Sequence, residues 1–181
     1  MHKLSALSAL VALMLAPAWA ADCNCDPLKP ETLTARQCSL CREAEKQPPE
    51  AIVFFLKDIN PRKTNRWLAL PRAHGAGQHH LHDLSPEIRT ALWTAAIEKA
   101  KSLWGDDWGL AYNGEKVRTQ CHTHIHIGKF LPGAEMDHGF ITVRRPSQIP
   151  APPGEGLWIH PVSKGMHVHL GEQTTEFVLL R

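Results

Sequence analysis

Three histidines, His122, His124 and His126, alternate with Thr123 and Ile125 near the middle of the chain. Alternation with a period of two is typical of a β-strand, and on a strand these imidazoles would project from one face. Imidazole changes protonation near neutral pH, so grouped rings can act as nucleophile, proton donor or metal ligand. Because histidine is costly to bury without a partner, the grouping favours a site over a purely structural strand. The alternatives are a cluster that only binds metal and a chance histidine-rich surface strand, since the chain has 12 histidines.

A second group of chemically active residues lies upstream, among the five cysteines. Cys38 and Cys41 have the spacing of metal ligands, but the same spacing also suits a redox pair or a local disulfide. Cys23 and Cys25 would pair with each other only with strain, because they are two residues apart. Cys121 alternates with the three histidines, so we expect it to be buried and inert.

A third group lies late in the chain. His167 and His169 again alternate on an expected strand, and His160 precedes them by one strand length. Together the three would make a further metal-binding set. Nothing else in the sequence decides between this role and histidines without a ligand.

The overall composition is that of an ordinary globular chain. It has 181 residues, 43% of them hydrophobic, and a formal net charge of +2. This length and hydrophobic content suit one core and one domain. The near-neutral charge does not indicate a surface for polyanions, so a nucleic acid polymer is not an expected partner.

Residues 1–20 differ from the rest of the chain. A lysine precedes an apolar run over residues 4–15, and an Ala-x-Ala site ends at Ala20. This pattern predicts a secretory signal peptide that is cleaved after Ala20. The run is short for a membrane span, and Asp22 before Cys23 is unlike a lipoprotein signal. We therefore expect an exported protein, periplasmic or secreted, without a stable membrane anchor.

Turn and capping signals divide residues 21–181 into elements of one domain. Ser85 is a typical N-cap with a proline after it, and Gly105 ends the apolar periodicity, which predicts a helix between them. Another helix is expected over residues 31–46, carrying the Cys38–Cys41 pair. Strands are expected over residues 51–56, 66–70, 108–112, 119–130, 157–160, 166–170 and 176–180, the last forming a C-terminal strand extension.

Two motifs in this order resemble the histidine triad (HIT) superfamily of nucleotide-processing enzymes. One is the hairpin from Asp58 to His74, and the other is Asn113-Gly114 followed by the histidine run that ends at Gly128. The resemblance covers roughly residues 37–131. It implies an α+β fold with a mostly antiparallel sheet and helices packed on one face. Arg118–Gln120 and Phe177–Leu180 are similar to the exported CDP-diacylglycerol pyrophosphatase branch.

The resemblance implies catalytic roles for four residues. His124 would attack an α-phosphorus and form a nucleotidyl-histidine that water hydrolyses. A backbone carbonyl would hold its other ring nitrogen. His126 would donate hydrogen bonds to phosphate oxygens, and Thr119 or Gln120 would reach the bridging or leaving oxygen.

Three further residues are implied in substrate binding. Asp58 matches an acid that binds ribose hydroxyls, although a simple turn cap is the alternative. Asn113 belongs to the matching Asn-Gly pair. Arg66 stands where the family often has a histidine; its planar guanidinium could bind phosphate through two hydrogen bonds. The alternative for Arg66 is an exposed arginine at a strand end.

Zinc-containing relatives imply a metal site at Cys38, Cys41, His74 and His122. Two thiolates and two imidazoles are a sensible tetrahedral zinc set, and such a zinc would be structural. The alternative is a disulfide between Cys38 and Cys41, since disulfides form readily in exported proteins.

These observations predict an exported hydrolase that cleaves a nucleotide phosphoanhydride or phosphoramidate through a His124 adduct. The expected partner is a nucleotide or a nucleotide-linked small molecule or lipid. The resemblance also implies a two-fold homodimer, because many members are dimers. Two alternatives stay open: a nucleotidyltransferase or phosphorylase of the same superfamily, and a non-catalytic module that binds zinc or nucleotide.

Overall fold

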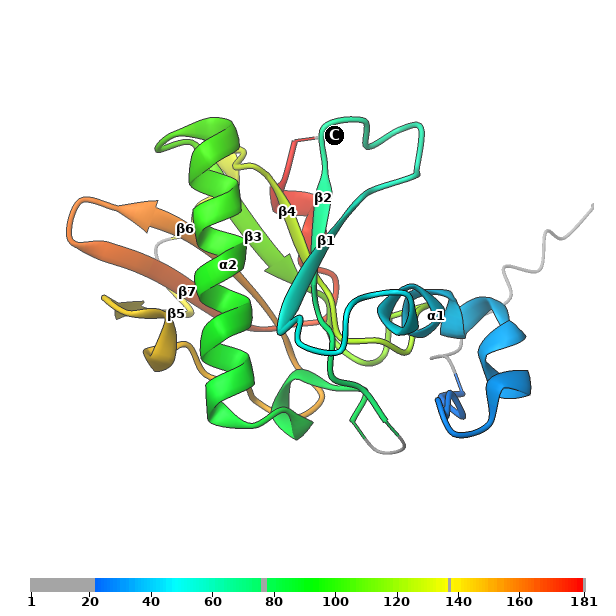
Figure 1. The fold of residues 1–181 in the computed structure, drawn as a ribbon. Helices are drawn as coiled ribbons and strands as arrows, with labels where there is room; N and C mark the ends of the chain where they lie inside the picture. The colour runs from blue at the N-terminus through cyan, green and yellow to red at the C-terminus, as the bar shows by residue number, and fades with distance from the viewer. Residues whose placement is uncertain (1–21, 76–77, 137, 181) are drawn as a thin grey trace, which may run out of the picture.

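The computed structural model describes residues 22–75, 78–136 and 138–180, which combine a seven-stranded sheet with few helices (Figure 1). The α+β class is as expected, and the expected signal peptide lies outside the described residues. The α-helices are α1 (Ser39–Glu45) and α2 (Pro86–Trp104). The strands are β1 (Val53–Lys57), β2 (Trp67–Pro71), β3 (Trp108–Tyr112), β4 (Ile125–Lys129), β5 (Phe140–Val143), β6 (Gly156–Val162) and β7 (Gly165–Glu172). Short 3-10 helices are η1 (Pro30–Thr34), η2 (Arg36–Cys38), η3 (Leu81–Asp83), η4 (Pro132–Ala134), η5 (Pro146–Gln148) and η6 (Glu176–Val178).

Every strand pair in the sheet is antiparallel, and the spatial order is β1-β2-β4-β3-β6-β7-β5. The β1–β2 hairpin is confirmed, with Phe55 opposite Ala69. β4 lies between β2 and β3, so the histidine-bearing strand has neighbours on both sides. A central strand is fully hydrogen bonded, which suits a scaffold that must hold side chains rigidly.

Helix α2 crosses the sheet and packs its buried side chains against the apolar side chains of one face (Figure 1). It begins after Ser85, whose hydroxyl accepts a hydrogen bond from the backbone N–H of Ile88, and ends at Gly105 with φ 57°. Both ends follow the expected capping chemistry. In the described part of the chain, no helix is long and apolar enough to cross a membrane.

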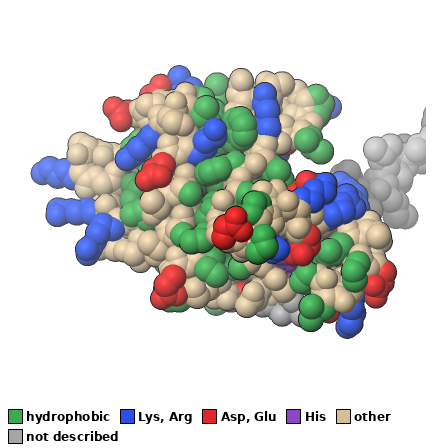
Figure 2. Space-filling model, in the orientation of Figure 1, with side chains coloured by type: hydrophobic (Ala, Val, Ile, Leu, Met, Phe, Trp, Pro, Cys, Tyr) green, Lys and Arg blue, Asp and Glu red, His purple; other side chains and the backbone are tan. Residues whose placement is uncertain are grey.

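The two faces of the sheet carry different side chains. Leu110, Ile127 and Ile159 belong to the apolar core beneath α2. On the opposite face the strand register forms one row, in the order Leu68, His126, Ala111, Trp158, His169 and Phe140. Figure 2 shows the face that carries α2, and only a small area of histidine is visible on it. Imidazoles are therefore gathered where α2 does not cover the sheet.

The short helix α1 packs on this second face, at the β1–β2 edge. Its Ala44 forms an apolar cluster with Phe54 and Leu70. The expected helix over residues 31–46 is thus α only from Ser39 to Glu45, with 3-10 turns before it. Pro30 at the start of η1 and the extended Ala35 between η1 and η2 interrupt a continuous helix.

The C-terminal segment also lies on the second face, but it does not form the expected strand over 176–180. It is the 3-10 helix η6, followed by an isolated bridge between Leu179 and Phe130. Leu179 sits over Gly109 and Gly128, and a Cβ on Gly109 would come within 2.6 Å of its side chain. The two glycines therefore allow the segment to close against the sheet.

Two disulfides tie the N-terminal segment to the rest of the fold. Cys23 pairs with Cys121, and Cys25 pairs with Cys38, whereas Cys41 is a buried free thiol. Cys121 is therefore not inert, and the Cys38–Cys41 disulfide that was the alternative to zinc does not form. The predicted burial of Cys121 is confirmed, but period-two spacing could not reveal a disulfide partner 98 residues away.

The Cys23–Cys121 disulfide should contribute more stability than Cys25–Cys38. In the chain-entropy account, loops of 98 and 13 residues correspond to about 4.7 and about 2.9 kcal/mol. We expect the Cys23→Ser/Cys121→Ser variant to unfold at lower denaturant than Cys25→Ser/Cys38→Ser. Chemical denaturation with equal m-values would measure this, and an equal or reversed order would contradict it.

Candidate active site

The triad histidines do not share one strand, because β4 begins between His124 and His126. The strand begins at Ile125, so His122 and His124 lie in the preceding loop, and the expected strand over 119–130 is too long. This loop is bonded to the N-terminal segment, because the backbone N–H of Cys121 donates to the carbonyl of Gln37. The rings of His124 and His126 nevertheless lie together, with centroids 5.0 Å apart and planes at 74°.

His124 is held in one tautomer by its own loop. Its Nδ1 lies 2.7 Å from the backbone oxygen of His122. A carbonyl can only accept, so Nδ1 carries the proton and the neutral ring keeps its lone pair on Nε2. Burial is the main reason that the pKa of His124 is lowered to about 4. His124 is therefore a neutral imidazole at pH 7, which is the form that can attack phosphorus.

His126 is a buried imidazole with little internal hydrogen bonding. Neither ring nitrogen has a hydrogen-bond partner among the described residues. Burial, and then the neighbouring His124, lower its pKa to about 3. Because an unsatisfied buried polar group costs free energy, these nitrogens mark a place where a polar ligand can bind.

Glu176 brings a carboxylate to the triad from the C-terminal segment. Its Oε2 lies 3.8 Å from His126 Nδ1 and 2.7 Å from Arg66, and it also pairs with Lys63. Burial raises the pKa of Glu176, but His126, Lys63 and Arg66 outweigh burial and lower it to about 2. Glu176 is thus ionised, and no sequence pattern indicated that it would lie at this site.

Arg66 does not have the predicted role of a phosphate clamp. The side chain is 1% exposed, so it is not the exposed strand-end arginine either. Nε donates to the carbonyl of Leu180, and the two terminal nitrogens donate to Glu176 and to the carbonyl of Leu179. Arg66 therefore fastens the C-terminal segment beside the triad.

Asn113 also serves the C-terminal segment instead of facing a substrate. Its Oδ1 accepts hydrogen bonds from Thr175 and from the backbone N–H of Glu176. Asp58, in contrast, lies near enough to His124 for its charge to raise that pKa. Its Oδ1 also accepts from the backbone N–H of Asn60, as in the turn-cap alternative. The predicted contact of Asp58 with ribose hydroxyls stays a prediction.

Thr119 and Gln120 lie in the loop before the triad. Thr119 is exposed, and Gln120 accepts a hydrogen bond from the hydroxyl of Ser39 on α1, 2.8 Å away. In the described part of the structure neither side chain is hydrogen bonded to a triad histidine. Their predicted contact with a leaving oxygen stays a prediction.

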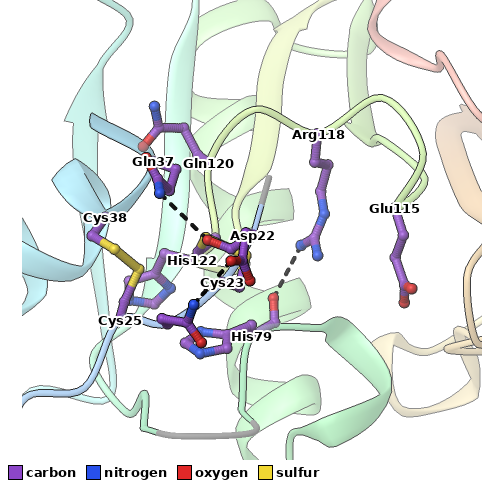
Figure 3. The surroundings of a disulfide bond; sticks show 12 residues. Asp22, Cys23, Cys25, Gln37, Cys38, His79, Glu115, Arg118, Gln120 and His122 are labelled. Carbon is purple, nitrogen blue, oxygen red and sulfur yellow. Dashed lines mark hydrogen bonds between the residues drawn. A yellow bond between two sulfur atoms is a disulfide. The ribbon is translucent and has the colours of Figure 1, made fainter. Parts of the chain in front are cut away.

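Arg118 is a functional candidate to which the sequence analysis assigned no catalytic or binding role. It is 5% exposed and donates to the carbonyl of His79, which also accepts from Thr123 (Figure 3). Its positive charge is one of the influences that lower the pKa of His124. The sequence signals were its position shortly before the triad and its place in the Arg118–Gln120 resemblance.

The predicted zinc ligands do not form a complete site in the disulfide-bonded structure. Cys38 is bonded to Cys25, so it has no thiolate to offer (Figure 3). His74 and His122 do come together, with ring centroids 5.1 Å apart. Three of their four ring nitrogens have no hydrogen-bond partner in the described residues, although His74 Nε2 lies 3.5 Å from a carboxylate oxygen of Glu45. Zinc at the set with Cys41 therefore stays a prediction, and it requires reduction of Cys25–Cys38.

Comparison with known proteins agrees with this geometry. No family model matches the chain. The chain is 28% identical over 118 residues to adenosine 5'-monophosphoramidase HNT1 of Saccharomyces cerevisiae, an alignment that covers 62% of this chain and 72% of that protein. This similarity, the antiparallel sheet and the paired rings of His124 and His126 support the resemblance to the histidine triad superfamily.

Proposed function

We propose that the protein is an exported hydrolase that cleaves a nucleotide phosphoramidate or phosphoanhydride through a covalent His124 intermediate. The observation that carries the proposal is the hydrogen bond from His124 Nδ1 to the carbonyl of His122. It fixes the proton on Nδ1 and leaves the Nε2 lone pair as the nucleophile. His126 lies beside it, and neither of its ring nitrogens has a hydrogen-bond partner among the described residues, so both are available to phosphate oxygens.

The reaction divides into two displacements at phosphorus. In the first, Nε2 of His124 forms a bond to the α-phosphorus while the bond to the leaving amine or phosphate breaks, and the leaving group keeps the electron pair of that bond and takes a proton from solvent. In the second, a water oxygen bonds to phosphorus, the nitrogen–phosphorus bond breaks, and the water's second proton is released. The products are a nucleoside monophosphate, the leaving group and unmodified His124.

Charged side chains around the triad support an anionic substrate. Lys63 and Arg66 together more than balance the charge of Glu176. These three residues line a cavity of about 160 Å³ with Thr174 and Phe177. Asp58, close to His124, is the candidate for the ribose hydroxyls. A nucleotide is therefore the substrate class that we propose.

The proposed leaving group follows from the comparison, and the proposed cellular location follows from the N-terminal sequence and the disulfides. The yeast relative is named as a monophosphoramidase, which favours a phosphoramidate as the first substrate to test. The narrower resemblance to CDP-diacylglycerol pyrophosphatases stays a prediction. Two disulfides suit an oxidising compartment, in keeping with the exported location that the N-terminal sequence predicts. The homodimer also stays a prediction.

Replacing His124 should abolish turnover. We expect His124→Ala to lower kcat/KM on the order of 10³-fold or more on the best substrate, because the adduct cannot form. The assay panel is adenosine phosphoramidate, dinucleoside polyphosphates, nucleotide sugars and CDP-diacylglycerol. His82→Ala is a matched control, since His82 stacks on His80 away from the triad and should retain activity.

The same panel separates the proposal from its alternatives. Trapping with labelled nucleotide should leave label on wild type and none on His124→Ala. Faster adduct breakdown on addition of phosphate would favour the transferase alternative. Wild type that never takes up label and is as inactive as His124→Ala would leave only a binding module.

Activity should persist to unusually acidic pH. The pKa of His124 is lowered from 6.5 to about 4, so the neutral nucleophile is present above that value and is lost as pH falls through it. We expect kcat/KM to keep its neutral-pH value down to about pH 5 and to fall about tenfold per unit below about pH 4. Circular dichroism at each pH would control for unfolding. An acid limb centred near pH 6.5 would contradict the buried neutral imidazole.

A further inference from the structure

Strands β6 and β7 bring three histidines together, two strands away from the catalytic strand β4. His160 and His167 are direct partners in the antiparallel register, and His169 follows two residues later on the same face of β7. One ring nitrogen from each lies within 4.8 Å of the others. Three imidazoles from adjacent strands thus converge on one point.

Aromatic rings hold each imidazole in place. His169 stacks on Trp158 at 3.5 Å between centroids, and His160 stacks on Phe130 at 4.4 Å. His167 stacks on Phe140 of β5 at 4.0 Å. These contacts fix the ring planes, so the convergence is preorganised and does not depend on flexible side chains.

The converging nitrogens have no hydrogen-bond partners among the described residues. This holds for His160 Nε2, His167 Nδ1 and both nitrogens of His169, which is fully buried. His160 Nδ1 lies 3.2 Å from the carbonyl of Pro161, which fixes the proton there and leaves a lone pair on Nε2. A histidine whose second nitrogen donates to a carbonyl is the usual arrangement of a metal ligand.

Glu135 adds a carboxylate from the solvent side. Its Oε1 lies 3.5 Å from His160 Nε2 and 3.3 Å from His167 Nδ1.

We propose that His160, His167, His169 and Glu135 bind a divalent transition-metal ion of the zinc class. Three imidazoles and one carboxylate are a favourable tetrahedral set for Zn²⁺, whereas Ca²⁺ and Mg²⁺ prefer oxygen ligands. Tetrahedral zinc places ligand nitrogens about 3.4 Å apart. The three ring nitrogens already lie within 4.8 Å of one another, so the rings need to move inward only slightly.

The position of this site indicates a structural role. His160 lies two strand spacings, or about 10 Å, from β4, and His167 and His169 lie three spacings, or about 14 Å, from it. His124 precedes the start of β4, so the ion would not reach its ring. Bound metal would instead fasten the segment around Glu135, which follows η4, to the β6–β7 hairpin. We therefore expect metal binding to change stability without supplying the catalytic group.

Cobalt titration of the chelator-treated full-length protein tests the proposal. Wild type should bind one equivalent at this site and show visible d–d bands without the thiolate charge-transfer band that a cysteine ligand would give. His167→Gln and Glu135→Gln should weaken Co²⁺ and Zn²⁺ binding about tenfold or more. Zinc should also raise the Tm of wild type and have little effect on that of His167→Gln.

Cys41→Ser is the matched control, since it alters the other candidate metal set and should leave the cobalt spectrum and affinity unchanged. Glu135 is substantially exposed, so Glu135→Gln should fold even if a histidine variant does not. No d–d bands in wild type, a thiolate band, or unchanged affinity in folded His167→Gln and Glu135→Gln would each overturn the proposal.

Discussion

Period-two alternation in an antiparallel sheet is the constraint on which the rest of this structure depends. Ile125 and Ile127 enter the core beneath α2, so His126 must face the opposite side. Antiparallel register then aligns it with Ala111, Trp158 and His169 in one row. A single apolar helix on one face thus determines that both histidine groups share the other.

Burial of imidazole rings that keep at least one ring nitrogen without a hydrogen-bond partner is the second feature that both groups share. An imidazole in such a position is kept neutral, because desolvation penalises its charged form. At His124 this makes a nucleophile, and the carbonyl of His122 decides which nitrogen attacks. Buried polar groups of this kind cost stability, and the α2 core and two disulfides are the parts of the fold able to offset that cost.

Local chemistry made much of this fold predictable, while long-range pairing did not. The cap at Ser85, the end at Gly105 and the hairpin around Asp58 follow from neighbouring residues alone. The partner of Cys121 and the burial of Arg66 depend on segments about 100 residues away. Arg66 could not be assigned from sequence because its partner, Glu176, lies in a segment that looked like an ordinary closing strand.

The charges that surround each histidine group decide what it can bind. Lys63 and Arg66 stand near His126 and outweigh the charge of Glu176, which favours the anionic substrate that we propose for the triad. The cluster on β6 and β7 instead faces Glu135, whose carboxylate lies within 3.5 Å of two of its rings and suits a cation. The same side chain, buried on the same face of the same sheet, is thus directed to opposite ligands by the sign of its neighbours. In the row across the sheet, Ala111 and Trp158 separate His126 from His169.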